Sequence, residues 1–424
     1  MKKILFFATL ACITFAGFAQ ESNKPSVKLY GFIRNYAAFD SRDNYGSNSD
    51  QFNMIPKDES LNEYGDDLNQ KADILLLSIT TRLGLNITGP EFLGAKTSAK
   101  IESDFAGFGT SNTVLRIRQA YAKMDWEKHS LLVGQAWHPM MGDMMPDVFS
   151  LATGAPFTPF SRTPQVRYNY LAGKFTLTAT AMYQFQYLSY GPSETKDENG
   201  NIKWSSATSF DYARKALIPE LYLQAMYKNN NFAMGAGVDI LTLKPRSEAV
   251  DNNGVKVPVD EYVIGFTPTI FASYKCGNWG IKGRATYAQN ASHLNMLSGY
   301  GVTEIKENGE WEYGTLNSVT GWIDVTYKQA LKKGSLTYCL FGGYGKNLGC
   351  NDDIKGMMFI RGFKNIDSFW RVAPSILYTH NAMQIGLEYE PTTVGYGNMK
   401  ADGSVDKTHS VTNHRICALL KYNF

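Results

Sequence analysis

Residues 175–187, with the sequence FTLTATAMYQFQY, alternate between apolar and polar side chains. Odd-numbered positions carry Phe, Tyr, Leu or Ala, and even-numbered positions carry Thr or Gln with the single exception of Met182. Successive side chains of a β-strand point to opposite faces of the sheet, so the pattern predicts a strand with one apolar and one polar face. The alternation is long for a strand of a soluble sandwich, and it has the length of a tilted strand that crosses a membrane.

The last residues of the chain repeat this pattern. Even-numbered positions from Ile416 to Phe424 are apolar or aromatic, and odd-numbered positions from Arg415 onward are polar or cysteine, with Leu419 as the exception. A final strand that closes on an aromatic residue is typical of bacterial outer-membrane barrels. The same alternation in mid-chain and at the last residues indicates a single architecture.

The same reading along the chain predicts sixteen strands. They cover residues 26–40, 73–88, 96–105, 114–126, 130–138, 164–171, 173–187, 217–228, 231–242, 261–275, 278–290, 319–329, 334–345, 367–379, 382–390 and 411–424. Short turns alternate with long polar connections at 41–72, 139–163, 188–216, 243–260, 291–318, 346–366 and 391–410, whereas 106–113 is brief. Hydrocarbon offers no partner to a free sheet edge, so the first and last strands must pair. We therefore expect an all-β fold, a transmembrane antiparallel up-and-down β-barrel of about 16 strands.

The N-terminus has the features of a secretory signal. Lys2 and Lys3 precede a short apolar run, and Gly17-Phe18-Ala19 supplies small residues at a cleavage point after Ala19. We expect residues 1–19 to be a signal peptide and residues 20–424 to be a single barrel domain. A lipoprotein signal that uses Cys12 is the alternative, although the residues before that cysteine fit such a signal poorly.

If the apolar faces meet lipid, the polar faces line the lumen, and the charges placed there can be named. The basic ones are Arg34, Arg82, Lys100, Arg116, Arg118, Arg167, Lys282, Arg284, Lys328, Arg371, Arg415 and Lys421. The acidic ones are Glu102, Asp104, Glu220, Asp239, Asp324, Glu388 and Glu390. The first six strands and the last carry a group that we call the basic ladder: Arg34, Arg82, Lys100, Arg116, Arg118, Arg167, Arg415 and Lys421.

A basic ladder beside an aqueous passage raises the local concentration of anions, which predicts a preference for anionic solutes. In the alternative, the arginines pair with Glu102, Asp104 or carboxylates of an inward loop, and the lumen has a transverse field with little net selectivity. Residues 140–163, MMGDMMPDVFSLATGAPFTPFSRT, are apolar, rich in Met and without Lys or Glu. We expect this third loop to fold into the lumen, with Asp143 and Asp147 facing the basic ladder across a constriction. An apolar cap on the rim or at a subunit contact is the alternative.

Three segments resemble a known family. Residues 115–121 read LRIRQAY, residues 132–135 read LVGQ, and residues 162–168 read RTPQVRY. Together they resemble the DcaP-like trimeric porins, which are sixteen-stranded and named for dicarboxylate uptake. The resemblance implies a homotrimer whose pores pass small, often negatively charged molecules, with Arg116, Arg118, Arg162 and Arg167 at or near the constriction. The Met-rich loop and a mature chain that begins at Gln20 suggest a Bacteroidetes-type source.

We therefore expect a porin of the bacterial outer membrane, a water-filled channel for passive diffusion of small hydrophilic and anionic solutes. Its expected partners are the lipid bilayer, lipopolysaccharide, solutes and two further copies of the chain. The formal net charge of +3 gives no indication of nucleic-acid binding. The alternatives are a phospholipase-like barrel enzyme and a non-conducting structural or adhesive barrel.

The sequence offers no catalytic residues, cofactor or metal site that we can recognise. None of the six histidines sits in a sequence motif for nucleophilic or metal chemistry; they are His129, His138, His293, His380, His409 and His414. We expect the four cysteines of the mature chain, Cys276, Cys339, Cys350 and Cys417, to be unpaired. The predicted topology places Cys276 in a short turn and Cys350 in an outer loop, a membrane thickness apart.

Overall fold

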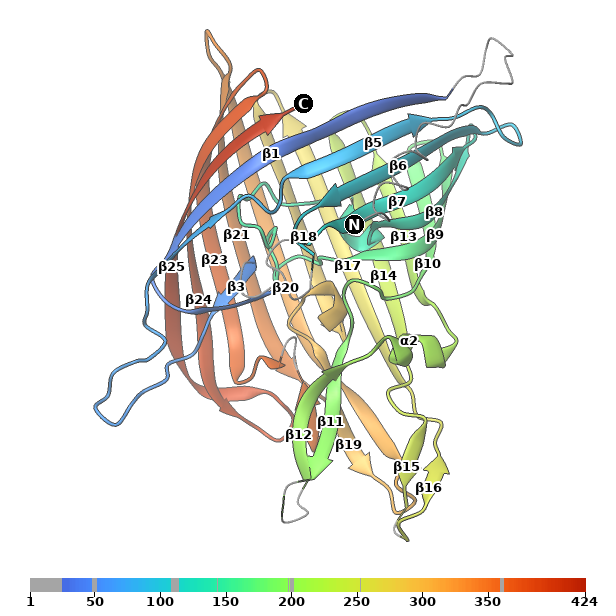
Figure 1. The fold of residues 1–424 in the computed structure, drawn as a ribbon, viewed down its shortest axis with the longest axis vertical. Coiled ribbons are helices and arrows are strands. Elements are labelled where there is room, and N and C mark those ends of the chain that lie inside the picture. Colours follow the sequence, from blue (N-terminus) through green and yellow to red (C-terminus); the bar gives the residue numbers. More distant parts are fainter. Residues whose placement is uncertain are drawn as a thin grey trace, which may run out of the picture.

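The computed structural model describes residues 25–47, 52–107, 114–142, 144–196, 198, 202–251, 253–358 and 362–424. Within these residues the chain forms a closed antiparallel barrel of sixteen strands (Figure 1). The second wall strand consists of β4 (Asp73–Leu77) and β5 (Arg82–Thr88), separated by a turn. The predicted signal peptide, residues 1–19, lies outside the described residues.

The other wall strands follow in chain order. They are β1 (Ser26–Asp40), β6 (Lys96–Asp104), β7 (Arg116–Asp125), β8 (His129–Trp137), β9 (Arg162–Ala172), β10 (Phe175–Met182), β13 (Glu220–Lys228), β14 (Phe232–Leu243), β17 (Val263–Cys276), β18 (Trp279–Gln289), β20 (Trp311–Ala330), β21 (Ser335–Gly349), β23 (Ile366–His380), β24 (Met383–Met399) and β25 (Val405–Asn423). Each of the sixteen predicted ranges overlaps one wall strand, so the predicted fold class is confirmed.

The barrel closes between the first and last strands. β1 pairs antiparallel with β25, from Phe32 opposite Asn423 to Asp40 opposite Arg415. On its other side β1 pairs with β4 and β5. Among the described strands of the wall, no sheet edge is therefore left open, as the hydrocarbon solvent requires. No helix in the described part of the chain is long and apolar enough to cross a membrane.

The two faces of the strands are as predicted. Along β10, Leu177 is 47% exposed on the outer face, whereas Thr180 is buried on the inner face. Both exceptions to the alternation, Met182 and Leu419, point inward, where Met182 packs with Met140 and Leu419 with Phe149. An apolar residue on the lumen face therefore marks a place where an inward segment covers the wall.

Tyr187 is a correction to the predicted facing. The alternation places it on the outer face, but it is buried, and its hydroxyl accepts a hydrogen bond from Arg162 Nη2 at 3.1 Å. The reason is that β10 ends at Met182, so the chain has left the wall before it reaches Tyr187.

Several long connections contain more strand than predicted. Residues 391–410, expected to be a loop, belong largely to β24 and β25, which pair as far as Met399 opposite Val405. Beyond the wall lie β11 (Tyr190–Lys196) with β12 (Ile202–Thr208), β15 (Glu248–Val250) with β16 (Lys256–Pro258), β19 (Gly299–Ile305), β22 (Gly356–Met358) and α2 (Phe210–Ala216). The labelled outer elements project from one end of the barrel (Figure 1). Backbone pairing continues past the membrane there because long antiparallel hairpins satisfy their own amides.

Three segments fold into the lumen. The first is the hairpin of β2 (Asn44–Ser47) and β3 (Phe52–Pro56), and the second is the third loop, residues 138–161, which begins with α1 (Pro139–Gly142). The third is the segment around η2 (Ser292–Leu294). Side chains of the first two segments, including Met54 and Phe157, form one buried cluster with Phe341 and Phe369 of the wall. The predicted inward third loop is confirmed.

The tip of the third loop is held by the wall through its backbone. The amides of Phe149 and Ser150 donate to Glu388 of β24 at 2.7 and 3.1 Å. Arg34 of β1 donates to the carbonyl of Phe149 at 2.5 Å, and Arg371 of β23 donates to the carbonyl of Ala155 at 3.4 Å. The loop is thus anchored to strands on either side of the closure.

The described cysteines are all free, as expected. Cys276 is exposed in its turn, and the other three are buried. Cys339 donates to Asp324 at 3.0 Å and Cys417 lies 2.9 Å from the hydroxyl of Tyr36.

A charge on the outer face should block assembly. Replacing Leu177 by Arg places a cation against the hydrocarbon, which costs about 2–4 kcal/mol at the bilayer midplane. Thr178→Arg is the matched control, because the adjacent side chain faces the lumen. Folding yield into lipid vesicles should fall for Leu177→Arg and be kept for Thr178→Arg, and equal yields would contradict the facing.

A second prediction concerns the space that wall glycines leave for the third loop. A Cβ at Gly343 would lie 2.7 Å from the ring of Phe157, so Gly343→Ala must displace the loop. We expect a loss of about 1–3 kcal/mol of stability from overpacking and a changed single-channel conductance. Gly342→Ala is the control, because its nearest neighbour lies 3.9 Å away. Identical melting and conductance of the two variants would show that the loop does not press on this wall.

Candidate functional site

The third loop and the basic ladder enclose a cavity of about 300 Å³, which we call the basic cavity. Its wall carries five cationic side chains, from Arg34, Arg82, Arg116, Arg118 and Lys421. Its other side is the third loop, with Val148, Ser150 and Leu151. Strands β1, β5, β7 and β25 supply the cations, and closure of the barrel places the last strand, β25, beside β1.

Three of the five cations are paired with carboxylates of β6. Arg116 binds Asp104 through two hydrogen bonds of 2.8 and 2.9 Å. Arg118 bridges Glu102 at 3.0 Å and Asp104 at 2.7 Å, and Arg82 lies 3.6 Å from Glu102. For these three residues the structure realises the alternative in which the ladder is neutralised by Glu102 and Asp104. Three guanidinium groups still share only two carboxylates.

The remaining two cations have no such partner. Among the described residues, neither Arg34 nor Lys421 forms an ion pair. Arg34 donates to the carbonyl of Phe149, and the ammonium group of Lys421 lies 4.2 Å from the centroid of the Phe32 ring. A carbonyl and an aromatic face stabilise a cation without cancelling its charge. These two side chains therefore supply most of the excess positive charge of the cavity.

Arg162 lies behind the cavity rather than in it. Its side chain is fully buried, with its guanidinium carbon 4.7 Å from the ring centroid of Trp137. It donates to Gln186 and to Tyr187, both at 3.1 Å. Since Trp137 and Tyr187 line the basic cavity, Arg162 orients the residues that form its surface.

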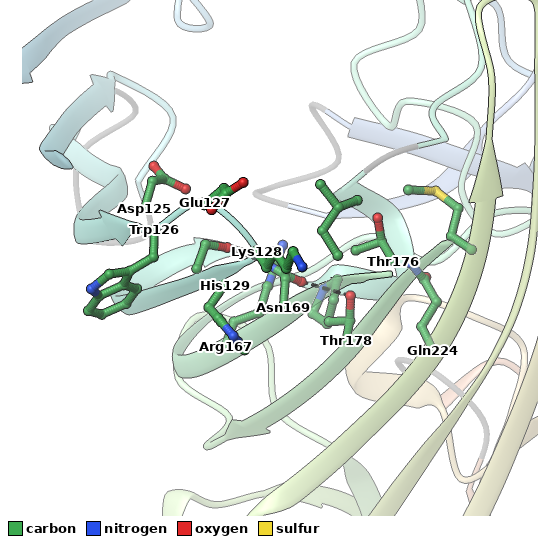
Figure 2. Close-up of a pocket in the computed structure, with 14 residues that line it drawn as sticks. Asp125, Trp126, Glu127, Lys128, His129, Arg167, Asn169, Thr176, Thr178 and Gln224 are labelled. Atoms are coloured by element: carbon green, nitrogen blue, oxygen red, sulfur yellow. Dashed lines mark hydrogen bonds between the residues drawn. The ribbon is translucent and has the colours of Figure 1, made fainter. Parts of the chain in front are cut away.

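The other ladder and lumen cations lie outside the basic cavity, and three of them illustrate where. Arg167 lines a second hollow of about 290 Å³ near the short turn between β7 and β8, together with Asn169, Thr178 and Gln224 (Figure 2). Lys100 lies over the ring of Tyr30, 5.1 Å from its centroid. Arg284 is buried in β18, where it donates to Thr269 at 3.1 Å. The ladder thus extends along the lumen, and only part of it surrounds the cavity.

The predicted placement of Asp147 opposite the basic ladder is wrong. Its carboxylate accepts a hydrogen bond from Lys282 of β18 at 2.8 Å, and its amide donates to Asp324 of β20. The third loop reaches β18 before it turns back, so the carboxylate of Asp147 pairs with Lys282 on that strand. Asp143 lies outside the described residues.

Sequence reasoning missed the anchor of the loop. Glu388 appears in the sequence only as one of several inward acids, yet it accepts both free amides at the loop tip. No local signal identifies this role, because the amides belong to residues 149 and 150, more than 200 positions away.

Sequence reasoning also missed a buried cluster of metal-ligating side chains. His138, Glu220, Asp239 and His293 meet inside the barrel, each offering one ligand atom within 4.8 Å of the others. No motif links them in the sequence, where His138 and His293 are far apart. They come together because the third loop and the η2 segment fold inward against β13 and β14.

Comparison with known structures supports the architecture. The DcaP outer membrane channel of Acinetobacter baumannii aligns with a TM-score of 0.64 and 21% identity, covering 96% of this chain and all of that one. An anion-selective porin from Comamonas acidovorans aligns at 0.52 and 11%, over 95% and 100% of the two chains. OmpT of Vibrio cholerae, in vitro folded in its trimer form, aligns at 0.51 and 13%, over 94% and 99%. At these identities the likeness concerns the fold.

The sequence itself carries the assignment to a family. No curated protein matches the chain at a significant level. The family model of the DcaP outer membrane protein, in contrast, matches residues 18–230, half of the chain. This range includes the segments 115–121, 132–135 and 162–168, on which the resemblance was based, and the strands that bear most of the basic ladder. The chain therefore belongs to the DcaP outer membrane protein family and is a β-barrel of the bacterial outer membrane.

Proposed function

We propose that this barrel is a porin whose narrowest region is the basic cavity, and that it passes small anionic solutes by passive diffusion. The observation that carries the proposal is the pair of unneutralised cations, Arg34 and Lys421, facing the third loop inside the lumen. An aqueous lumen is expected at this size, because sixteen strands enclose more space than side chains from the wall can fill.

The charge balance of the cavity favours anions. Five cations line it, and their neighbouring ion-pair partners are Glu102 and Asp104. Walls of low dielectric focus this excess charge into the passage and raise the local anion concentration. The guanidinium group of an arginine such as Arg82 can bind a carboxylate or a phosphate through two parallel hydrogen bonds.

Three other acidic groups of the lumen lie on β20 and β24. Asp324 and Glu388 are bound to the third loop, and Glu390 lies 3.5 Å from Arg371. Asp324 is far round the wall from β1 and β25, and its separation from the basic cavity gives the lumen a transverse field. Such a field orients dipolar solutes as they pass, in addition to the selection by net charge.

The similar proteins agree with this proposal. The protein from Acinetobacter baumannii is described as an outer membrane channel, and the one from Comamonas acidovorans as an anion-selective porin. The trimer form of OmpT agrees with the expected homotrimer. We propose the same assembly here, with lipid and lipopolysaccharide around three barrels.

Reversal potentials in a planar bilayer under a salt gradient test the selectivity. We expect the wild-type protein to prefer chloride over potassium, and the double variant Arg34→Gln and Lys421→Gln to lose this preference severalfold, since both unneutralised charges are gone. Lys333→Gln is the control, because Lys333 is an exposed lysine of a short turn. Its selectivity should equal that of the wild type.

Three outcomes would contradict the proposal. Cation selectivity of the wild-type channel would show that the acidic side of the lumen governs permeation. Equal selectivity of the double variant and the Lys333→Gln control would show that Arg34 and Lys421 do not face the ion path. A folded protein without conductance would exclude the porin function.

A further inference from the structure

Four ionisable side chains meet in the interior, outside the basic cavity. His138 follows β8 at the start of the third loop, and His293 lies in η2. Glu220 is the first residue of β13, and Asp239 lies in β14. All four are at most 2% exposed, so water does not solvate their charges. Buried charges require paired or coordinated partners, and this cluster must supply them internally.

The distances between the ligand atoms are short. Nε2 of His138 and Nε2 of His293 each lie 2.9 Å from the same oxygen of Glu220, Oε1. The two imidazoles also lie 3.6 and 4.0 Å from the carboxylate oxygens of Asp239. Ligands at about 2.0–2.1 Å from a tetrahedral zinc ion lie roughly 3.3 Å from one another, which falls within this spread.

Hydrogen bonds within the protein leave part of the cluster unsatisfied. Oε2 of Glu220 and Oδ1 of Asp239 are buried and have no hydrogen-bond partner among the described residues. The same is true of Nδ1 of His293. Buried polar atoms of native proteins are almost always satisfied, and unsatisfied ones indicate a bound water or ion. Here two of the three atoms are carboxylate oxygens that face two imidazoles.

We propose that His138, Glu220, Asp239 and His293 bind one divalent transition-metal ion, with zinc as the best match. Two imidazole nitrogens and two carboxylate oxygens form a ligand set of the kind that zinc takes in proteins. The ion balances the two carboxylates and leaves both imidazoles neutral. No protein group other than these four is needed to complete a tetrahedral site.

Ion binding has a local consequence at His138. Nδ1 of this residue accepts a hydrogen bond from the amide of Met140 at 3.2 Å, so the ring proton is on Nε2, which donates to Glu220. A neutral imidazole that binds a metal through Nε2 carries its one proton on Nδ1, so the proton moves from Nε2 to Nδ1 and the contact with the amide of Met140 must lengthen. Zinc uptake therefore shifts the first turn of the third loop.

The site ties together the segments that form the basic cavity. His138 belongs to the third loop and His293 to the η2 segment, whereas both carboxylates belong to the wall. Two hydrogen bonds already link these segments, from Phe160 to the carbonyl of Leu294 at 2.7 Å and from Asn295 to the carbonyl of Phe160 at 2.8 Å. Phe160 and Asn295 both line the basic cavity. The metal is thus a clamp that fixes two inward segments to β13 and β14.

The first test is the metal content of the full-length protein, refolded into detergent with zinc or with a chelator and then freed of unbound ion. We expect one zinc ion per chain by elemental analysis. Cobalt(II) in place of zinc should give the intense visible absorption of a tetrahedral site. Wild-type protein that folds in zinc and retains none would overturn the proposal.

The variants His293→Ala and Asp239→Asn should each abolish stoichiometric zinc binding. His409→Ala is the matched control, because His409 is 46% exposed on an outer strand and pairs with Asp58. Heat-modifiable gel mobility reports barrel folding independently of zinc. A folded His293→Ala protein with the zinc content of wild type would overturn the assignment.

Removal of the ion gives a further readout. Chelation before refolding should lower the melting temperature of the wild-type protein and increase open-channel current noise, because the inward segments lose their clamp. The His293→Ala variant should show the same noise with and without zinc. Zinc-dependent noise that persists in this variant would place the effect at another site. Anion selectivity is measured separately, so these results do not depend on the proposed function.

Discussion

Backbone amides in hydrocarbon must find partners within the protein, and the rest of this structure depends on that constraint. It is met by the pairing of β1 with β25, which brings residues near both ends of the chain into one wall. Arg34 and Lys421 are direct neighbours across this pairing. The closure that satisfies the amides therefore also assembles the basic cavity.

A closed wall of sixteen strands creates a second requirement, because its lumen is wider than wall side chains can fill. The third loop occupies this space and brings apolar residues with it. Glycines of the wall receive its aromatic rings, as at Gly343 beside Phe157 and Gly386 beside Phe149. At the tip of the loop, the carbonyl of Phe149 accepts a hydrogen bond from Arg34, and its amide donates one to Glu388. The passage that remains borders the cations left without carboxylate partners.

The alternation of side chains predicted the wall well, since a strand's facing is a local property with a period of two. Residues 175–182 and the last ten residues gave the correct faces, and even the exceptions Met182 and Leu419 were informative. Contacts between distant segments could not be predicted in this way. The sequence indicated an inward third loop from its composition but placed Asp147 opposite the wrong wall. It gave no sign that His138 and His293 would share two carboxylates, because that depends on where two loops cross.

The central claim is that the folded third loop sets the width of the passage. The most direct measurement compares the single-channel conductance of the wild-type protein with that of a variant in which residues 147–157 are replaced by a short Gly-Ser linker. If the loop narrows the lumen beside the basic cavity, the variant will form a folded barrel with a larger conductance and weaker ion selectivity. An unchanged conductance in the folded variant would show that another part of the barrel limits the flow, and would contradict the account.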